Sequence, residues 1–250
     1  MAKATKAKDY GNFQLVGETP AYRLVLRSWG RDKCGKNHFG FTGPGPVFGQ
    51  YLDPGGTEGV AEKFRRGEHG PAKEIYTIPY RFNKGKMDQD AAVEIRDQFI
   101  EDYEVALQHA RTIQWDETEV WELFRWAEFG GESGVPRNYG PLNATYRNLL
   151  QQAYDAGVNL QLIQKVKEKW EDNAKGIGHP TGVFEPMGFK DANYIVQVSL
   201  EHSWDEEEGF KVKVVNCRQN MSLAGQEFVG LDFPTLGMMI FPDSSEEDWQ

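Results

Sequence analysis

The chain has 250 residues, 39% hydrophobic and 26% charged, a size and composition typical of one α/β domain with additions or of two small domains. A formal net charge of −10 excludes a large, generally basic surface of the kind that coats DNA, but it allows a confined basic groove.

The sequence also indicates the compartment of the protein and whether it associates with a membrane. No apolar run approaches the ~20 residues that cross a bilayer, and the basic N-terminus is not followed by an apolar signal segment. The two cysteines, Cys34 and Cys217, show neither metal-binding nor disulfide spacing. We therefore expect a cytoplasmic protein with no membrane partner.

Apolar periodicity predicts strands that alternate with helices along most of the chain. The expected strands are Tyr22–Ser28, Val47–Leu52 (ending at Asp53), Glu74–Tyr80, Thr112–Trp115 and Val158–Ile163, and the expected helices are His38–Phe41, Glu58–Arg65, Asp90–Ala110, Glu117–Phe129 and Leu142–Tyr154. Such alternation is typical of a three-layer α/β domain with a mainly parallel sheet covered on both faces.

The C-terminal half departs from this alternation. Strands Tyr194–Leu200 and Phe210–Val215 flank a turn and predict an antiparallel hairpin, while the polar, glycine-containing segment 170–188 predicts a loop or a mobile hairpin. We expect a polar arm at residues 1–19, one domain at 20–235 with the hairpin 194–217 as an addition, and an acidic tail at 236–250.

A phosphate-binding motif follows the first expected strand. The octet Gly30-Arg-Asp-Lys-Cys-Gly35-Lys36-Asn37 has the frame Gly-x-x-x-x-Gly-Lys-[Ser/Thr], in which loop N–H groups surround phosphates and the lysine reaches the β/γ-phosphates. The predicted nucleotide-binding residues are Gly30, Lys33, Cys34, Gly35, Lys36, Asn37 and His38. Asn37 stands where a hydroxyl should bind Mg²⁺, and an ordinary glycine-containing turn is the alternative. Cys34 is expected to react with thiol reagents if this loop is exposed.

Acidic and amide side chains follow other strands. Asp116, after Thr112–Trp115, is expected to hold Mg²⁺ together with Asn37, although it also fits a helix N-cap. Glu58, or else Glu117, is the candidate that would position the attacking water for hydrolysis of the nucleotide. Each could instead be an acidic residue that the helix dipole favours in the first turn of a helix. Gln164 ends a strand and is expected to sense the γ-phosphate, unless it is only a strand-end amide.

These motifs resemble the phage-encoded RecA-like P-loop ATPases, a group often described only as an AAA domain, some of which are single-strand annealing recombinases. The resemblance covers roughly residues 20–235 and is carried by Gly30–Asn37, Phe41–Val47, Tyr51–Asp53, Glu58–Val60, Glu62–Phe64, Arg111–Asp116, Glu119–Leu123, Arg137–Asn143 and Asn159–Gln164. It implies ATP, Mg²⁺ and a role in DNA metabolism, with Lys36 as the phosphate-loop lysine and Asp116 as the strand-end carboxylate. Asn37 departs from the family pattern.

The expected function is ATP-dependent action on single-stranded DNA in phage recombination or replication. The basic segment from Lys165 through Lys167 and Lys169 to Trp170 is the candidate DNA contact, with a solvated loop as its alternative. RecA-like cores imply a homo-oligomeric ring or filament, and the acidic tail is a candidate contact for a phage or host replication protein. The alternatives are a non-hydrolysing nucleotide-binding structural or regulatory subunit and a small-molecule kinase.

Overall fold

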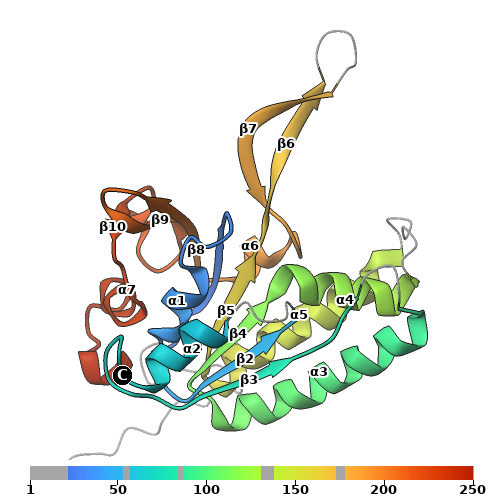
Figure 1. Cartoon of the computed structure of the whole chain (residues 1–250), viewed down its shortest axis with the longest axis horizontal. Helices are drawn as coiled ribbons and strands as arrows, with labels where there is room; N and C mark the ends of the chain where they lie inside the picture. The colour runs from blue at the N-terminus through green and yellow to red at the C-terminus, as the bar shows by residue number, and fades with distance from the viewer. Residues whose placement is uncertain (1–21, 53–56, 84–86, 131–137, 173–177, 250) are drawn as a thin grey trace, which may run out of the picture.

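The computed structural model describes residues 22–52, 57–83, 87–130, 138–172 and 178–249, and it is an α/β protein with a mainly parallel eight-stranded sheet (Figure 1). The strand order is β10-β9-β8-β1-β5-β4-β2-β3, and a separate sheet contains only β6 and β7. The strands are β1 Val25–Gly30, β2 Val47–Tyr51, β3 Ile75–Pro79, β4 Thr112–Asp116, β5 Asn159–Gln164, β6 Val166–Asp172, β7 Gly178–Pro186, β8 Val198–Asp205, β9 Gly209–Cys217 and β10 Glu227–Val229. The helices are α1 Lys36–Phe41, α2 Glu58–Arg65, α3 Gln89–His109, α4 Glu117–Phe129, α5 Tyr139–Ala156, α6 Ala192–Ile195 and α7 Phe233–Ile240.

Side-chain alternation along β1 separates two layers of helices. Val25 belongs to the core formed with α3, α4 and α5, whereas Leu24 and Leu26 belong to a core formed with α1 and α7. Because successive strand residues point to opposite faces, these helices cover the two sides of the sheet. The predicted three-layer α/β arrangement is confirmed at this level.

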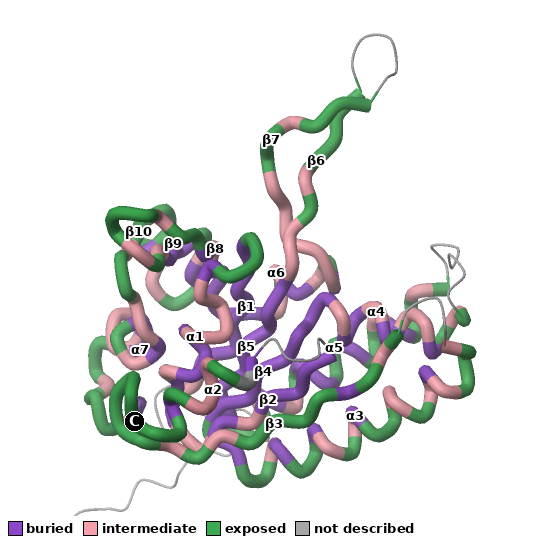
Figure 2. The backbone as a smooth tube through the Cα atoms, viewed as in Figure 1, coloured by how far each residue is buried: buried purple, intermediate pink, exposed green. Residues whose placement is uncertain are grey.

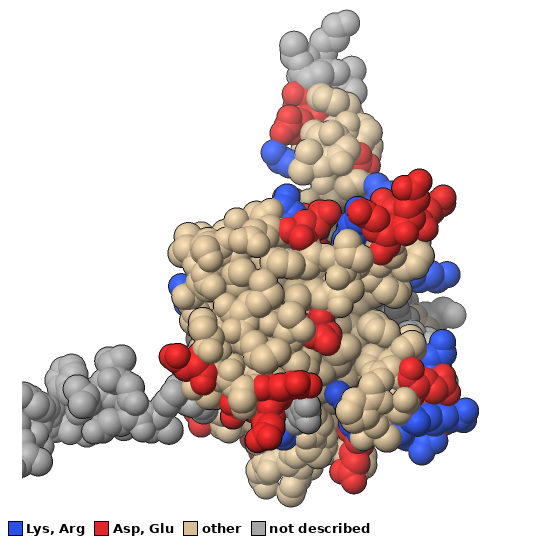
Figure 3. Space-filling model, turned by 90° about the vertical axis from the view of Figure 1, so that its left-hand side faces the viewer, with Lys and Arg blue, Asp and Glu red and all other residues tan. Residues whose placement is uncertain are grey.

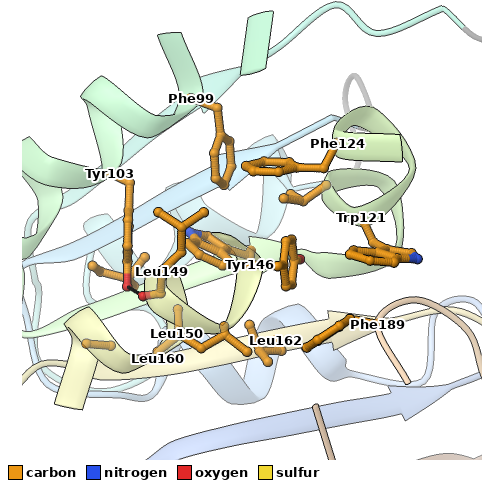
Figure 4. Packing of buried hydrophobic residues seen from close by; sticks show 14 of the residues in the cluster. Phe99, Tyr103, Trp121, Phe124, Tyr146, Leu149, Leu150, Leu160, Leu162 and Phe189 are labelled. Atoms are coloured by element: carbon orange, nitrogen blue, oxygen red, sulfur yellow. Dashed lines mark hydrogen bonds between the residues drawn. The ribbon is translucent and has the colours of Figure 1, made fainter. Parts of the chain in front are cut away.

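The core on the α3–α5 side is rich in aromatic rings. Phe99 of α3, Phe124 of α4 and Tyr146 of α5 point toward one another across the helix layer (Figure 4). Trp115 of β4 is fully buried beneath them, with its ring centroid 4.6 Å from that of Tyr103. This packing holds the end of β4, where the chain turns into α4, against the helix layer.

The predicted hairpin at residues 194–217 exists, but it starts later and belongs to the main sheet. Residues 192–195 form α6, and β8 begins only at Val198. β8 pairs with β9 in antiparallel fashion and with β1 in parallel, so it continues the sheet beside the central strand. The hairpin was expected to be an addition to the domain, but its strands are part of the main sheet.

The polar segment after β5 forms a second hairpin. β6 and β7 pair in antiparallel register and project from the body of the molecule (Figure 1). Figure 2 shows that this hairpin is largely exposed, whereas the central strands are buried. Of the two forms expected for residues 170–188, a loop or a hairpin, the structure has the hairpin.

The last fifteen residues are not only an acidic tail. Helix α7 crosses the expected boundary at residue 236, and Trp249 is fully buried near the end of the chain. Its ring lies against Gly237, where an added Cβ would come within 2.4 Å of it. Three buried residues, Leu236, Ile240 and Trp249, therefore anchor the acidic C-terminal sequence to the domain.

Two further features concern a helix boundary and membrane-crossing segments. Helix α5 begins at Tyr139, ahead of the start expected at Leu142, and Pro141 fits in its first turn because its missing N–H costs no hydrogen bond there. In the part of the chain that the structure describes, no helix combines the length and apolar character that a membrane crossing needs.

Candidate functional site

The motif predicted after the first strand forms a strand–loop–helix unit. β1 ends at Gly30 and α1 begins at Lys36. Gly30 has φ of +152°, and an added Cβ would lie 2.2 Å from the backbone oxygen of His202 on β8. Gly35 has φ of +89°, where a Cβ would lie 2.8 Å from the ring of Phe210. Both glycines of the motif are thus required by backbone conformation and by close neighbours.

The lysine of the motif folds back onto its own loop. Lys36 Nζ donates hydrogen bonds to the backbone oxygens of Gly30, at 2.9 Å, and Arg31, at 2.7 Å. An ammonium group has three donors and no acceptor, so these contacts satisfy it with neutral carbonyl groups. Phosphate oxygens would be stronger, charge-assisted acceptors for the same group.

Cys34 is part of the loop but does not lie at the surface. Its side chain is 3% exposed, and its Sγ donates to the backbone oxygen of Arg31 at 2.8 Å. Burial raises the pKa of the Cys34 thiol, although nearby Lys36 opposes this effect. The expected accessibility to thiol reagents is therefore not supported.

Asn37 and His38 lie in the first turn of α1, and both are half-buried. The His38 ring packs against those of Phe64, His69 and Phe210. Burial lowers the pKa of His38, and the neighbouring charges of His69 and Lys63 lower it further. His38 therefore belongs to an aromatic group beside the loop.

The loop lies where the chain leaves neighbouring parallel strands toward opposite faces of the sheet. The chain continues from β1 into α1, whose Phe39 packs on the face of the sheet where Leu26 lies. Phe189 and Ala192, in the segment that connects β7 to β8, pack on the opposite face, where Val25 lies. β1 and β5 are adjacent and parallel, so a crevice is expected outside their carboxyl ends. Ligands of open α/β sheets bind in such crevices.

Asp116 ends β4, one strand beyond β5, and is 7% exposed. It occupies the N-cap position of α4, but its side chain does not accept the capping hydrogen bond. The carboxylate therefore takes the N-cap position without the N-cap interaction that was the alternative explanation for this residue.

Glu117 is buried completely and is held by hydrogen bonds. Its Oε1 accepts from the backbone N–H of Phe189 at 2.8 Å, and its Oε2 accepts from Gln164 Nε2 at 2.9 Å. Burial raises the pKa of Glu117 to about 7, the two hydrogen bonds oppose the shift, and the charge of Asp116 adds to it. A carboxyl group with a pKa near neutrality can act as a general base.

The structure thus brings together two of the predicted catalytic residues, Glu117 and Gln164. The third candidate, Glu58, begins α2, but its side chain lies outside the described part of the structure, as does Asp53. Lys36 and its loop form a separate group on the α1 side.

Buried amides connect the strands to the loop, and one of them, Gln161, has no role in the sequence motifs. Gln161 Nε2 donates to Ser28 Oγ and to the backbone oxygen of Lys36, both at 3.0 Å. Gln161 Oε1 and Gln164 Oε1 are buried and have no hydrogen-bond partner. Amides within the apolar strands β4 and β5 are the sequence signal for this group, since buried polar groups need a structural or functional reason.

Arg27 is a second residue that the motifs did not reveal. The residue is 9% exposed, and its guanidinium donates to Ser199 Oγ at 2.9 Å and Asn193 Oδ1 at 2.8 Å. Burial lowers the pKa of Arg27 to about 10, with the charge of Glu117 opposing the shift. Arg27 and Gln164 also line a cavity of about 840 Å³ at the base of the β6–β7 hairpin.

That cavity and another of about 700 Å³ beside Lys73 and Asp232 are both lined by residues outside the phosphate-loop motif. The cavity volumes alone would place a ligand elsewhere, but neither cavity is lined by the loop that follows the central strand β1. The candidate site is therefore defined by the geometry of the loop and not by cavity volume.

The expected DNA-contact segment is not a basic groove. Lys165, Lys167 and Lys169 pair with Glu119, Glu185 and Glu171, respectively. Trp170 is 63% exposed, which leaves its ring available for stacking. On the face of the molecule that Figure 3 shows, which is the left-hand side of Figure 1, the coloured acidic and basic side chains form separate groups without a continuous basic surface.

A metal ion at this site would need ligands in addition to protein side chains. Among the described residues, no group of three or more His, Cys, Asp and Glu side chains could hold one. Mg²⁺ is commonly bound by one or two carboxylates together with substrate phosphates and water, and oxygen donors suit it. Asp116 and the side-chain oxygen of Asn37 are donors of this type.

Comparison with known proteins does not place the chain in a family. No protein-family model matches it. No curated protein shows significant similarity to it. The function must therefore be argued from the geometry of the site.

Proposed function

We propose that this protein is an ATP-binding, RecA-like P-loop ATPase that uses Mg²⁺ and acts on single-stranded DNA in phage recombination or replication. The observation that carries the nucleotide part is the loop from Gly30 to Lys36 at the carboxyl end of the central strand β1. Its backbone oxygens at Gly30 and Arg31 accept hydrogen bonds from the lysine ammonium. Asp116 and Gln164 end parallel strands of the same sheet.

The proposed role of the loop is to bind the phosphates. Backbone N–H groups between Gly30 and Lys36 would donate to phosphate oxygens, and Lys36 would exchange its two carbonyl acceptors for the charged β/γ-phosphates. Cys34 is buried and donates to the backbone oxygen of Arg31, a bond that helps to maintain the loop conformation.

Asp116 and Asn37 would hold Mg²⁺, which would supply positive charge against the phosphates. Asp116 supplies the carboxylate, and Asn37 supplies an amide oxygen where the usual motif has a hydroxyl. Both oxygen donors fit the preference of Mg²⁺, but the amide departs from the usual set.

Hydrolysis would use Glu117 to accept a proton from the attacking water. Its pKa of about 7 suits a base that works near neutral pH. Gln164 donates to this carboxylate and therefore orients it. We now favour Glu117 over Glu58 because its partners and its pKa support the role.

A specific observation favours a second candidate function, a non-hydrolysing nucleotide-binding structural or regulatory subunit. An added Cβ on Gly188 would lie 2.0 Å from Glu117 Oε2, and Phe189 donates to the other oxygen, so this segment covers the carboxylate. Water can reach Glu117 only if the segment moves. Under this candidate function, the segment stays closed and the bound nucleotide acts as a ligand.

Interactions with other molecules complete the proposal. The projecting β6–β7 hairpin offers exposed Trp170 to a base of single-stranded DNA. A ring or filament of identical subunits would place the nucleotide at a subunit border. The exposed acidic residues 246 and 247, next to anchored Trp249, would contact a phage or host replication protein.

Titration calorimetry with ATP and Mg²⁺ tests the nucleotide site. Lys36→Ala should abolish binding, because the phosphate charge loses its partner at the loop. Lys213→Ala, which removes an exposed lysine from β9, is the matched control and should bind like the wild type. Equal affinity of the wild type and Lys36→Ala would reject the proposed site, whereas ATP binding without turnover would favour the non-hydrolysing subunit.

A further inference from the structure

Two exposed aromatic rings lie at the edge of the phosphate loop. Trp204 and Phe210 face each other across the β8–β9 hairpin, with ring centroids 4.6 Å apart. Trp204 is 56% exposed and Phe210 is 37% exposed. Such cross-strand pairs stabilise hairpins, but that role does not require the rings to lie beside the loop.

One member of the pair, Phe210, is in direct contact with the motif. An added Cβ on Gly35 would lie 2.8 Å from Phe210 Cδ1, and the ring of His38 stacks on Phe210 with centroids 5.8 Å apart. β8 runs parallel to β1 and pairs with it through His202 and Gly30. The end of β8 is therefore fixed at the carboxyl edge of the sheet where the loop begins.

We propose that Trp204 and Phe210 are the stacking surface for the purine base of the nucleotide whose phosphates the loop binds. This inference rests on the proposed nucleotide-binding function and adds the recognition of the base to it. A ribose separates base from phosphates, so a base belongs at the rim of the loop and not within it. Purines offer a larger π-face than pyrimidines, and a purine nucleotide is therefore the favoured ligand.

The charge around the pair favours a single nucleotide over a nucleic-acid strand. Four consecutive acids, Asp205 to Glu208, form the turn of the hairpin. The nearby Lys211 is paired with Asp205 and Glu208 and offsets only one of these four negative charges. A strand of phosphates across Trp204 would be repelled by this turn, whereas an uncharged base would not.

Two ligands separate recognition of the base from recognition of the phosphates. ATP has both parts, and tripolyphosphate has only the phosphates. Calorimetry with Mg²⁺ should compare the wild type with Trp204→Leu, Phe210→Leu and Phe210→Tyr. Tyr194→Leu, which removes a ring that is 72% exposed on α6, is the matched control.

Each leucine variant should weaken ATP binding by about five-fold or more, because stacking contributes on the order of 1 kcal/mol or more per base. Both should bind tripolyphosphate like the wild type, and Phe210→Tyr and Tyr194→Leu should bind ATP like the wild type. The wild type should also bind ATP more tightly than CTP.

Three results would overturn the inference. Unchanged ATP affinity in both leucine variants would show that the rings do not contact the base. A parallel loss of ATP and tripolyphosphate binding would show that the rings only support Gly35 and the loop. Failure of the wild type to bind either ligand would reject the proposed function itself, and the inference with it.

Discussion

Gln164 donates its Nε2 hydrogen to Glu117 Oε2 at 2.9 Å, although the two residues are 47 positions apart. The contact forms because Gln164 ends β5 and Glu117 follows β4, and these strands are parallel neighbours. Gln164 Oε1 has no partner, so its amide can rotate and accept a hydrogen bond instead of donating one. The pair can therefore accommodate a charged or a neutral group at position 117.

This freedom leads to a prediction for Glu117→Gln. The pKa of Glu117 is about 7 in the folded protein and about 4.5 when unfolded. Between these values the folded state binds more protons, so the free energy of unfolding contributed by Glu117 falls as pH rises, and its full contribution is present below about pH 4.5. Glutamine stays neutral. The free energy of unfolding of Glu117→Gln minus that of the wild type should therefore increase between about pH 5 and about pH 8. The expected increase is on the order of 3 kcal/mol.

Urea unfolding at the two pH values measures this difference. His202 is fully buried, and burial lowers its pKa to about 3, so its contribution to stability has the opposite slope below about pH 6.5. Comparing each variant with the wild type at the same pH removes that contribution. Glu94→Gln, an exposed carboxylate on α3, is the control. Identical pH profiles of stability for Glu117→Gln and the wild type would show that burial does not raise the pKa of Glu117.

Asn37 provides a separate prediction about metal binding. Asn37→Thr restores the hydroxyl of the usual motif at the start of α1, so ATP turnover should rise or stay unchanged. Asn37→Ala removes every side-chain oxygen and should lower turnover. Phosphate release with Mg²⁺ present measures both. A large loss in Asn37→Thr would mean that the amide has a role of its own and that the metal assignment is wrong.

The outline of the fold could be predicted from local signals. Helices α2 and α4 have the bounds expected from the sequence, and Gly130 ends α4 in the left-handed conformation that glycine favours. The position of β8 in the sheet could not be predicted, because alternation identifies a strand but not its partner. Helix α7 was missed because it has only eight residues and its sequence includes a proline and a glycine.

The site could be predicted only in part, for a related reason. The glycine-and-lysine spacing located the loop, and strand ends located Asp116, Glu117 and Gln164. Which face of the sheet each side chain occupies depends on strand register and on the packed helices, neither of which is local. The Glu117–Gln164 contact and the burial of Arg27 therefore required the three-dimensional structure.

Trp249 tests whether the acidic C-terminus is part of the fold. Its ring stacks on Phe241, its Nε1 donates to Ser244 Oγ at 2.8 Å, and its side chain is fully buried. Trp249→Ala should lower the free energy of unfolding by about 3–5 kcal/mol, the usual cost of such a cavity. Trp170→Ala, at a tryptophan that is 63% exposed, should change it by less than about 0.5 kcal/mol. Equal urea midpoints for both variants would show that the last residues do not support the domain.

The last prediction concerns single-stranded DNA and the β6–β7 hairpin. Lys165, Lys167 and Lys169 are each paired with a glutamate, so few phosphate contacts are available and binding should depend only weakly on salt. Each contact contributes a slope of about −0.7 for single strands. Stacking on Trp170 should instead provide most of the affinity, and Trp170→Ala should lose roughly 1–3 kcal/mol.

Fluorescence anisotropy with a labelled oligonucleotide and ATP measures both effects. Tyr76→Ala removes a ring that is 51% exposed on β3 and serves as the control, because it lies at the far edge of the sheet. Wild-type affinity in both Trp170→Ala and a triple lysine-to-alanine variant would remove the hairpin from the DNA contact. If the wild type binds no oligonucleotide even at low salt, the recombinase proposal is wrong, and a regulatory nucleotide-binding subunit becomes the better explanation, because the argument for the loop around Lys36 does not depend on DNA.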